Sequence, residues 1–242
     1  SSAASDVYKR QVFAWRSGAR RRLAWSAGLD ALLLTDPVPR RRFGADNMAL
    51  EMFRVAEPLA ESPVLDGLSF WQGEEHRTEA ESQLGEAAGG FLAVSPFGKD
   101  AAKELEPAQL GELLARCHES TGLPAVLLGG PADNAKVEEL TPRLASPVLD
   151  LVGKNGLKTA AAILERASGL LCVDSGLMHL GALVGTPSVA LFGPIPPHRW
   201  RPFRDGALQV VQGRTRGMAA GSAPEFDLDA ISSAVASALR PQ

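Results

Sequence analysis

A short run in the second half of the chain combines residue types that are suited to binding a phosphate group. Residues 174–179 read Asp-Ser-Gly-Leu-Met-His and directly follow an apolar run. Ser175 can cap the helix that follows, and Gly176 leaves the amides of its first turn open to close approach by an anion. His179 falls in the same first turn, where its imidazole can donate to a phosphate oxygen. The spacing alone fits both a phosphate site and an ordinary junction between a strand and a helix.

Small and polar residues follow the neighbouring apolar runs as well. Residues 95–98 (Ser-Pro-Phe-Gly) follow the first run, with Lys99 and Lys103 a little further on. Residues 129–131 (Gly-Gly-Pro) follow the second run, and residues 153–156 (Gly-Lys-Asn-Gly) follow the third. Glycine backbone lets an anionic ligand approach closely. A turn alone also explains Gly-Gly-Pro, and a solvated helix-entry lysine also explains Lys103.

The elements that would position these residues alternate regularly from about residue 88 onward. We expect strands at 91–94, 125–128, 148–152, 169–173, 188–192 and 208–211, and helices at 107–119, 132–141, 157–167, 177–184 and 227–239. Continuous apolar strands separated by helices indicate βαβ units and a parallel sheet that is covered on both faces. In such a sheet, ligands bind beyond the carboxyl ends of the strands. The sequence therefore predicts an α/β protein with a doubly wound, Rossmann-like domain over residues 88–242.

The chain before residue 88 has a patchier pattern. We expect a helix around Ala14 to Leu23, a possible strand at Ala31 to Leu34 with Asp36 behind it, and a helix over Asn47 to Glu57. The polar stretch 61–90 is broken by glycines, which is typical of a linker.

Residues 1–11 (SSAASDVYKRQ) show no core pattern and look like a translated sequencing adapter. We expect them to be a scar, with the native start of the gene missing. Residues 12–87 would then be a partial amino-terminal domain and its linker.

Composition excludes several classes of protein. A formal net charge of −3 argues against generic nucleic-acid binding. The two cysteines, Cys117 and Cys172, lie inside apolar or helical patterns, which indicates core residues in a reducing cytoplasm. The four histidines share no metal-ligand spacing. No apolar run approaches the ~18 residues of a membrane span. We therefore expect a soluble cytoplasmic protein without a bound metal.

Three segments in order resemble the signature of the family 9 glycosyltransferases, the ADP-heptose:lipopolysaccharide heptosyltransferases and their relatives. They are the run 174–180, the Gly-Thr-Pro of residues 185–187, and the strand end Phe-Gly-Pro of residues 192–194. The turn 127–131 resembles the family's "LLGGP" segment, and residues 151–157 resemble its "LaGkxxL" segment. The combination is specific to the family, whereas each piece alone is not.

The resemblance implies a GT-B fold, in which two Rossmann-like domains face each other across the active site. The carboxyl-terminal domain would bind the nucleotide sugar, and the amino-terminal domain would bind the acceptor. It further implies inverting, metal-independent transfer of a heptose or related sugar from a donor such as ADP-heptose to a lipopolysaccharide core acceptor. No cofactor is implied besides the nucleotide sugar, which is a substrate. The protein would be cytoplasmic or peripheral on the inner membrane.

The resemblance also implies roles for individual residues. Ser175, Gly176 and His179 would contact the donor diphosphate, and Asp174 would position their loop or reach the sugar. Lys103 would help to neutralise the leaving diphosphate. The remaining residues implied to bind the nucleotide are Gly129, Gly130 and Leu157.

The sequence departs from the family at four places. Gly181 stands where the family usually has Ala, Glu104-Leu105 replace the Trp that usually follows the family's Lys, and the loop Phe97 to Ala102 is not of the family's Gly-Ala-Ser type. The second and third departures make Lys99 a competitor for the role of Lys103. The family's general base, an Asp in a glycine-containing loop, has no counterpart, and Asp36 is not assigned that role.

Two other functions remain open at this point. One is a non-catalytic nucleotide-binding module, and the other is a GT-B sugar-nucleotide epimerase, which should carry further cleft carboxylates that the sequence does not offer. The basic patch of Arg16, Arg20, Arg21 and Arg22 suggests contact with the phosphates of a lipid acceptor, although a solvated face also explains it.

Overall fold

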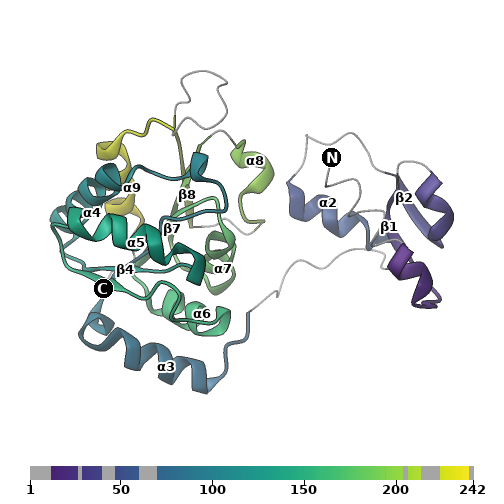
Figure 1. Ribbon diagram of the computed structural model, residues 1–242, viewed down its shortest axis with the longest axis horizontal. Helices are drawn as coiled ribbons and strands as arrows, with labels where there is room; N and C mark the ends of the chain where they lie inside the picture. Colours follow the sequence, from purple (N-terminus) through teal and green to yellow (C-terminus); the bar gives the residue numbers. More distant parts are fainter. Residues whose placement is uncertain are drawn as a thin grey trace. The chain divides into compact units, whose positions relative to one another are not determined.

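The computed structural model describes residues 12–26, 29–39, 47–59, 70–193, 195–203, 207–213 and 224–239. The chain divides into two compact units, Ser1–Gly67 and Leu68–Gln242 (Figure 1). Residues 1–11, which the sequence suggests to be a scar, lie outside the described residues.

The second unit is built on a parallel sheet with the strand order β5-β4-β3-β6-β7-β8. This is the order of a doubly wound Rossmann-like sheet, in which the chain reverses its direction of growth between β3 and β6. Each strand lies within two residues of its predicted position. The strands are β3 (Leu92–Ser95), β4 (Ala125–Leu127), β5 (Val148–Asp150), β6 (Gly169–Val173), β7 (Ser188–Phe192) and β8 (Leu208–Gln212).

Helices cover both faces of this sheet and bury two apolar clusters. One cluster joins the sheet to α3 (Glu74–Leu84), α6 (Leu157–Arg166) and α7 (Gly176–Val184). The other joins it to α4 (Pro107–Thr121), α5 (Asn134–Leu140) and α9 (Leu228–Ala238). The short helix α8 (Pro197–Trp200) follows β7. The central strands β3, β4, β6 and β7 are buried along their whole length because successive side chains enter opposite clusters, whereas the edge strands β5 and β8 are partly exposed.

Strand β6 shows this alternation. Leu170 and Cys172 belong to the cluster beneath α6 and α7, and Leu171 and Val173 belong to the cluster beneath α4 and α9. Cys172 is therefore a core residue, as the sequence predicts. Cys117 on α4 is also buried and free.

Helix α3 corrects the expected linker and the expected domain boundary near residue 88. Residues 74–84 are helical, and Ala80 and Leu84 are buried against α6. The Nδ1 atom of His76 lies 3.1 Å from Oγ1 of Thr159 on α6, and Gln72 donates to Glu165 at 2.7 Å. This helix belongs to the second unit, because it completes the apolar layer under α6.

The Gly-Thr-Pro segment ends α7 and bonds to the neighbouring helix α6. Gly185 ends α7 with a φ of +76°, a left-handed conformation that glycine adopts without strain. The hydroxyl of Thr186 donates to the carbonyl of Leu164 on α6 at 2.6 Å, inside the core. A Cβ added at Gly181 would lie 2.7 Å from Cδ2 of Leu170, so α7 packs directly on β6. The glycine at position 181, where the family usually has Ala, therefore permits this close packing.

The first unit contains a parallel pair of strands, β1 (Leu23–Ser26) and β2 (Asp36–Pro39). The predicted helix at Ala14 to Leu23 is confirmed only over residues 12–16, because Gly18 ends it at a φ of +71°. The predicted strand at Ala31 to Leu34 is wrong, since η1 (Leu29–Leu33) is a 3₁₀ helix. Helix α2 (Met48–Arg54) and the 3₁₀ turn η2 (Glu57–Leu59) complete the described part, and α2 lies where the sequence predicts a helix.

Replacing Thr186 by Val is expected to destabilise the second unit by about 1–2 kcal/mol, because the buried hydrogen bond to Leu164 is lost with little change in volume. Thr186→Ser keeps the hydroxyl and is the matched control. Urea unfolding followed by circular dichroism measures both. Equal stability of Thr186→Val and the unsubstituted protein would show that this bond contributes nothing.

Candidate functional site

A cavity of about 830 Å³ lies at the carboxyl ends of the strands, where β3 and β6 run side by side. Ser95 of β3 and the residues that follow β4, β5 and β6 line it. Its position is the one at which doubly wound sheets bind ligands. Of the residues proposed from the sequence, the lining includes Lys103, Gly129, Gly130, Leu157, Asp174, Ser175 and Gly176.

An ion pair crosses the cavity between the two central loops. Nζ of Lys103 lies 2.6 Å from Oδ2 of Asp174, and both side chains are largely buried. Lys103 ends the 3₁₀ turn η4 (Ala101–Lys103), which Asp100 caps by accepting from the amide of Ala102 at 3.0 Å. Asp174 follows the last residue of β6. The structure thus brings together the two residues that the family resemblance suggests for catalysis, and they form an ion pair with each other.

Two helices begin at the cavity without a side-chain cap. Gly156, the N-cap of α6, has no side chain to cap the helix, and the side chain of Ser175, the N-cap of α7, does not bond the first-turn amides. The Ser175 hydroxyl is buried and has no hydrogen-bond partner among the described residues. A Cβ placed at Gly156 or Gly176 would meet open space. Free amides, two positive helix ends and an unpaired hydroxyl are suited to an anion.

The expected capping role of the Ser175 side chain is wrong, because the hydroxyl leaves the amides free. The backbone position is nevertheless the predicted one. A buried hydroxyl without a partner is costly in a folded protein. Among the described residues, four buried side-chain atoms have no partner, and two of them, Ser175 Oγ and Asn155 Oδ1, belong to residues that line the cavity.

The glycine pair after β4 forms one wall of the cavity. The amide of Gly130 donates to Oδ2 of Asp133 at 3.0 Å. A Cβ at Gly129 would lie 3.1 Å from the same oxygen and 3.3 Å from Val152. A side chain at position 129 would therefore be crowded by Asp133 and Val152. The sequence proposed Gly129 and Gly130 for the site, and both line it.

Two charged lining residues, Asp133 and Lys136, were given no role from the sequence. They come from η5 (Pro131–Asp133) and α5, where a charged residue is usually part of a solvent-exposed helix face. Asn155 belongs to the loop 153–156 that the sequence placed after a strand, and its Oδ1 is buried without a partner among the described residues. Only the long-range contacts of Lys136, 2.6 Å from Glu104, reveal that it faces the cavity.

His179 lies on the first turn of α7, as predicted, but it is partly exposed and is not part of the cavity wall. The pKa of His179 lies below its usual range because partial burial of the ring disfavours the imidazolium, while the charge of Asp174 opposes that shift. A neutral imidazole keeps one N–H donor.

Among the described residues, no group of three or more His, Cys, Asp and Glu side chains is placed to hold a metal ion. In the same part of the chain, no helix has both the length and the apolar composition that a membrane span requires.

Comparison with known proteins decides the family. The sequence model of "Glycosyltransferase family 9 (heptosyltransferase)" matches residues 34–222, which is more than half of the chain. The chain belongs to glycosyltransferase family 9. This result confirms the resemblance carried by the Asp-Ser-Gly, Gly-Thr-Pro and Phe-Gly-Pro segments.

Curated relatives of this family 9 chain are heptosyltransferases. Lipooligosaccharide heptosyltransferase 2 of Haemophilus influenzae is 30% identical over 112 residues, which cover 44% of this chain and 31% of the relative. Lipopolysaccharide heptosyltransferase 2 of Escherichia coli K12 is 25% identical over 225 residues, covering 86% and 64%. The chain therefore spans less than two thirds of the length of these relatives.

Solved structures share the fold. A family 9 glycosyl transferase from Veillonella parvula matches 94% of this chain and 70% of its own with a TM-score of 0.81 at 20% identity. The ADP-heptose lps heptosyltransferase II of E. coli matches 94% of this chain and 73% of its own, with a TM-score of 0.74 at 20% identity. The E. coli heptosyltransferase WaaC with ADP matches 87% of this chain and 62% of its own, with a TM-score of 0.59 at 20% identity. At this identity the likeness concerns the fold, and it confirms the expected GT-B type.

Replacing Lys103 by Met strands the largely buried carboxylate of Asp174, so we expect the second unit to lose about 2 kcal/mol of stability. The double variant Lys103→Met, Asp174→Asn removes both charges and is expected to recover part of that loss. Urea midpoints of the single and double variants form the test. Strictly additive losses would contradict a coupled pair.

Proposed function

We propose that this protein acts as a glycosyltransferase that moves a heptose, or a related sugar, from a nucleotide diphosphate to a lipopolysaccharide core acceptor. The observation that carries the proposal is the open end of α7, where Ser175 presents an unpaired hydroxyl and Gly176 free space at the switch point of the sheet. The names of the curated relatives supply the sugar and the acceptor class. ADP is the first donor nucleotide to test, because the WaaC structure contains it.

In the proposed reaction, the acceptor hydroxyl forms the new bond to the anomeric carbon from the face opposite the diphosphate, which inverts the configuration. The C–O bond to the diphosphate breaks and its electron pair stays on the diphosphate oxygen, while the acceptor gives its proton to a base. The rate depends on how well the growing negative charge is stabilised.

We propose that the chain's own groups stabilise this charge without a metal ion. The amides at the start of α7 and the Ser175 hydroxyl can donate to the diphosphate, with His179 beside them on the same turn. Asp174 orients Lys103 and can accept from a sugar hydroxyl. Gly129, Gly130 and Leu157 contact the nucleoside on the far wall, where Leu157 exposes an apolar side chain.

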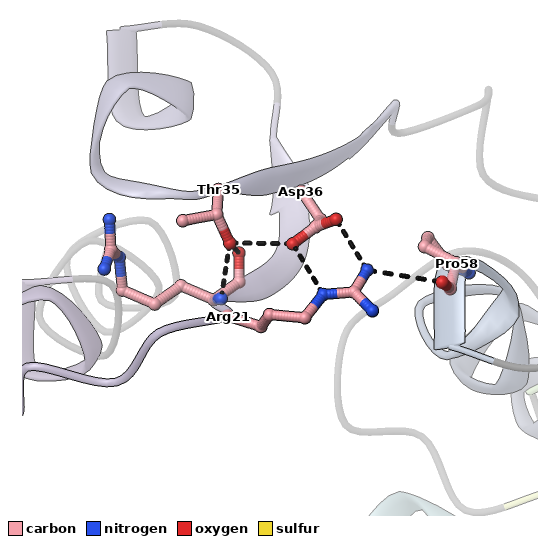
Figure 2. Close-up of polar contacts among 5 residues, drawn as sticks. Arg21, Thr35, Asp36 and Pro58 are labelled. Atoms are coloured by element: carbon pink, nitrogen blue, oxygen red, sulfur yellow. Dashed lines mark hydrogen bonds and ion pairs between the residues drawn. The ribbon is translucent and has the colours of Figure 1, made fainter.

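A nucleotide-binding module without transfer activity is the second candidate. Asp36 of the first unit is bound by the Arg21 guanidinium at 2.7 Å and by the Thr35 hydroxyl at 2.7 Å (Figure 2). These hydrogen bonds hold the pKa of Asp36 below its usual range, with the bond from Arg21 as the larger cause. A carboxylate with a lowered pKa is a weak general base. If the transfer had to draw its base from Asp36, it would therefore be slow, and this is the observation that favours the second candidate.

We further propose a cytoplasmic location, with contact to the inner-membrane surface through the start of the first unit. Arg21 and Arg22 are committed to internal contacts with Asp36 and with the carbonyl of Leu33. Arg16 and Arg20 are exposed, and Phe13 and Trp15 are 77% and 55% exposed. Exposed aromatic and basic side chains on one short segment suit an anionic lipid surface.

Calorimetric titration with ADP, UDP and GDP in the absence of metal tests the donor site. We expect selective binding of ADP, weakened about tenfold in Ser175→Ala because a charge-assisted hydrogen bond is lost. Ser237→Ala on α9, which also removes a serine hydroxyl, is the control. Absence of binding by all three nucleotides would overturn the proposed function. Release of ADP from ADP-heptose only when a core acceptor is present separates the transferase from the module.

Charge reversal at Arg16 and Arg20 tests the membrane contact. The double variant Arg16→Glu, Arg20→Glu is expected to sediment less with anionic vesicles while its affinity for the nucleotide stays unchanged. The control is the same measurement with neutral vesicles. Equal sedimentation of both proteins would show that these two arginines do not contact the membrane surface.

A further inference from the structure

Three lysines line the cavity, and the structure commits two of them to carboxylates. Lys103 is paired with Asp174 at 2.6 Å. Lys136 is paired with Glu104 at 2.6 Å and lies 3.5 Å from Asp133. Within the part of the chain that the structure describes, the Lys99 side chain makes no ion pair or hydrogen bond. Its ammonium is therefore the uncompensated positive charge among the three.

The loop that carries Lys99 is fixed on both sides of that residue. On one side, the amide of Gly98 donates to Oε1 of Glu104 at 2.8 Å. Lys136 bonds the same carboxylate oxygen and lies 3.4 Å from the Gly98 carbonyl. On the other side, Asp100 caps η4. Lys99 thus extends from an anchored loop, and little backbone entropy is lost when its ammonium meets a ligand.

The paired lysines of the cavity offer little net positive charge to an anionic ligand. The Lys103–Asp174 pair is neutral, and Lys136 shares its charge with two carboxylates. A diphosphate that enters the cavity brings at least two negative charges. Lys103 can serve it fully only by leaving Asp174, a carboxylate that is 9% exposed. Stranding a carboxylate at that depth is unfavourable. An exposed lysine on the same wall has no such cost.

We propose that Lys99 is the residue whose ammonium contacts the donor diphosphate, with Lys103 acting mainly as the partner that orients Asp174. This assignment rests on the proposed function. It makes Lys99 a catalytic residue, because the diphosphate gains a further negative charge when the C–O bond to the sugar breaks and its electron pair stays on the diphosphate oxygen. Contact with a cation that is free beforehand stabilises that charge without breaking another pair.

Substitution of Lys99 by Gln tests the assignment by calorimetry with ADP and with adenosine. We expect ADP to bind about tenfold or more weakly, since one charge-assisted hydrogen bond is lost. Adenosine carries no phosphate, so its affinity should stay unchanged. Lys99→Arg keeps the positive charge and is expected to restore most of the ADP affinity. The affinity of Lys99→Gln for ADP should also depend less on salt concentration.

Lys158→Gln is the matched control. It removes the same net charge from the start of α6, where the ammonium lies 4.7 Å from the Trp71 ring centre, and Lys158 is not part of the cavity wall. We expect its ADP affinity to stay within twofold of the unsubstituted protein. Thermal unfolding of each variant verifies that the fold is retained, and an exposed lysine should not alter it.

The outcomes separate the two proposals. If the unsubstituted chain binds ADP and Lys99→Gln binds it equally well, the assignment of Lys99 is overturned while the proposed function stands. Equal weakening of ADP and adenosine would overturn it too, because the effect would then not concern the phosphates. If the unsubstituted chain binds no nucleoside diphosphate, the proposed function fails and the assignment fails with it.

Discussion

The pairing of β3 with β6 is the constraint on which the site depends. The two strands run parallel in a register that sets Ser95 opposite Cys172. The chain leaves β3 towards α4 on one face of the sheet and leaves β6 towards α7 on the other. The loops after these strands must therefore diverge, and a cavity opens between them. The same pairing brings Lys103 and Asp174, 71 residues apart in the chain, to 2.6 Å.

Once this cavity exists, its polar groups divide into those that the fold satisfies and those that it leaves open. Asp174 and Glu104 each form an ion pair with a lysine, and Asp133 accepts a hydrogen bond from the Gly130 amide. The Ser175 hydroxyl and Oδ1 of Asn155 have no partner among the described residues. Folding alone gains nothing from such groups. Both residues line the cavity, where a bound ligand could supply the missing partners, which is how a functional site can reduce stability.

The sheet and most of the lining could be predicted because strand apolarity and glycine-rich turns are local signals. The helix α3 could not, because its sequence is polar and only Ala80 and Leu84 are buried. Its attachment depends on contacts such as Gln72 with Glu165, which join residues 93 positions apart. Lys136 was missed for the same reason, since its partner Glu104 lies 32 positions away. Periodicity identifies an element that buries a stripe, but not a side chain that reaches across a cavity.

Two positions where the chain departs from the family pattern have local explanations. At Gly181, the space that an Ala methyl would need is filled by Leu170, so the glycine and the large neighbour fit as a pair. At Glu104, a carboxylate takes the place of an apolar side chain and is matched by Lys136 and the Gly98 amide. The second replacement shapes the loop of Lys99, because the Gly98 amide and Lys136 both bond the Glu104 carboxylate there. The signature residues 174–176 and the glycine pair 129–130 therefore predict backbone that lines the cavity, whereas the pairing of Lys136 depends on Glu104, which lies outside the signature.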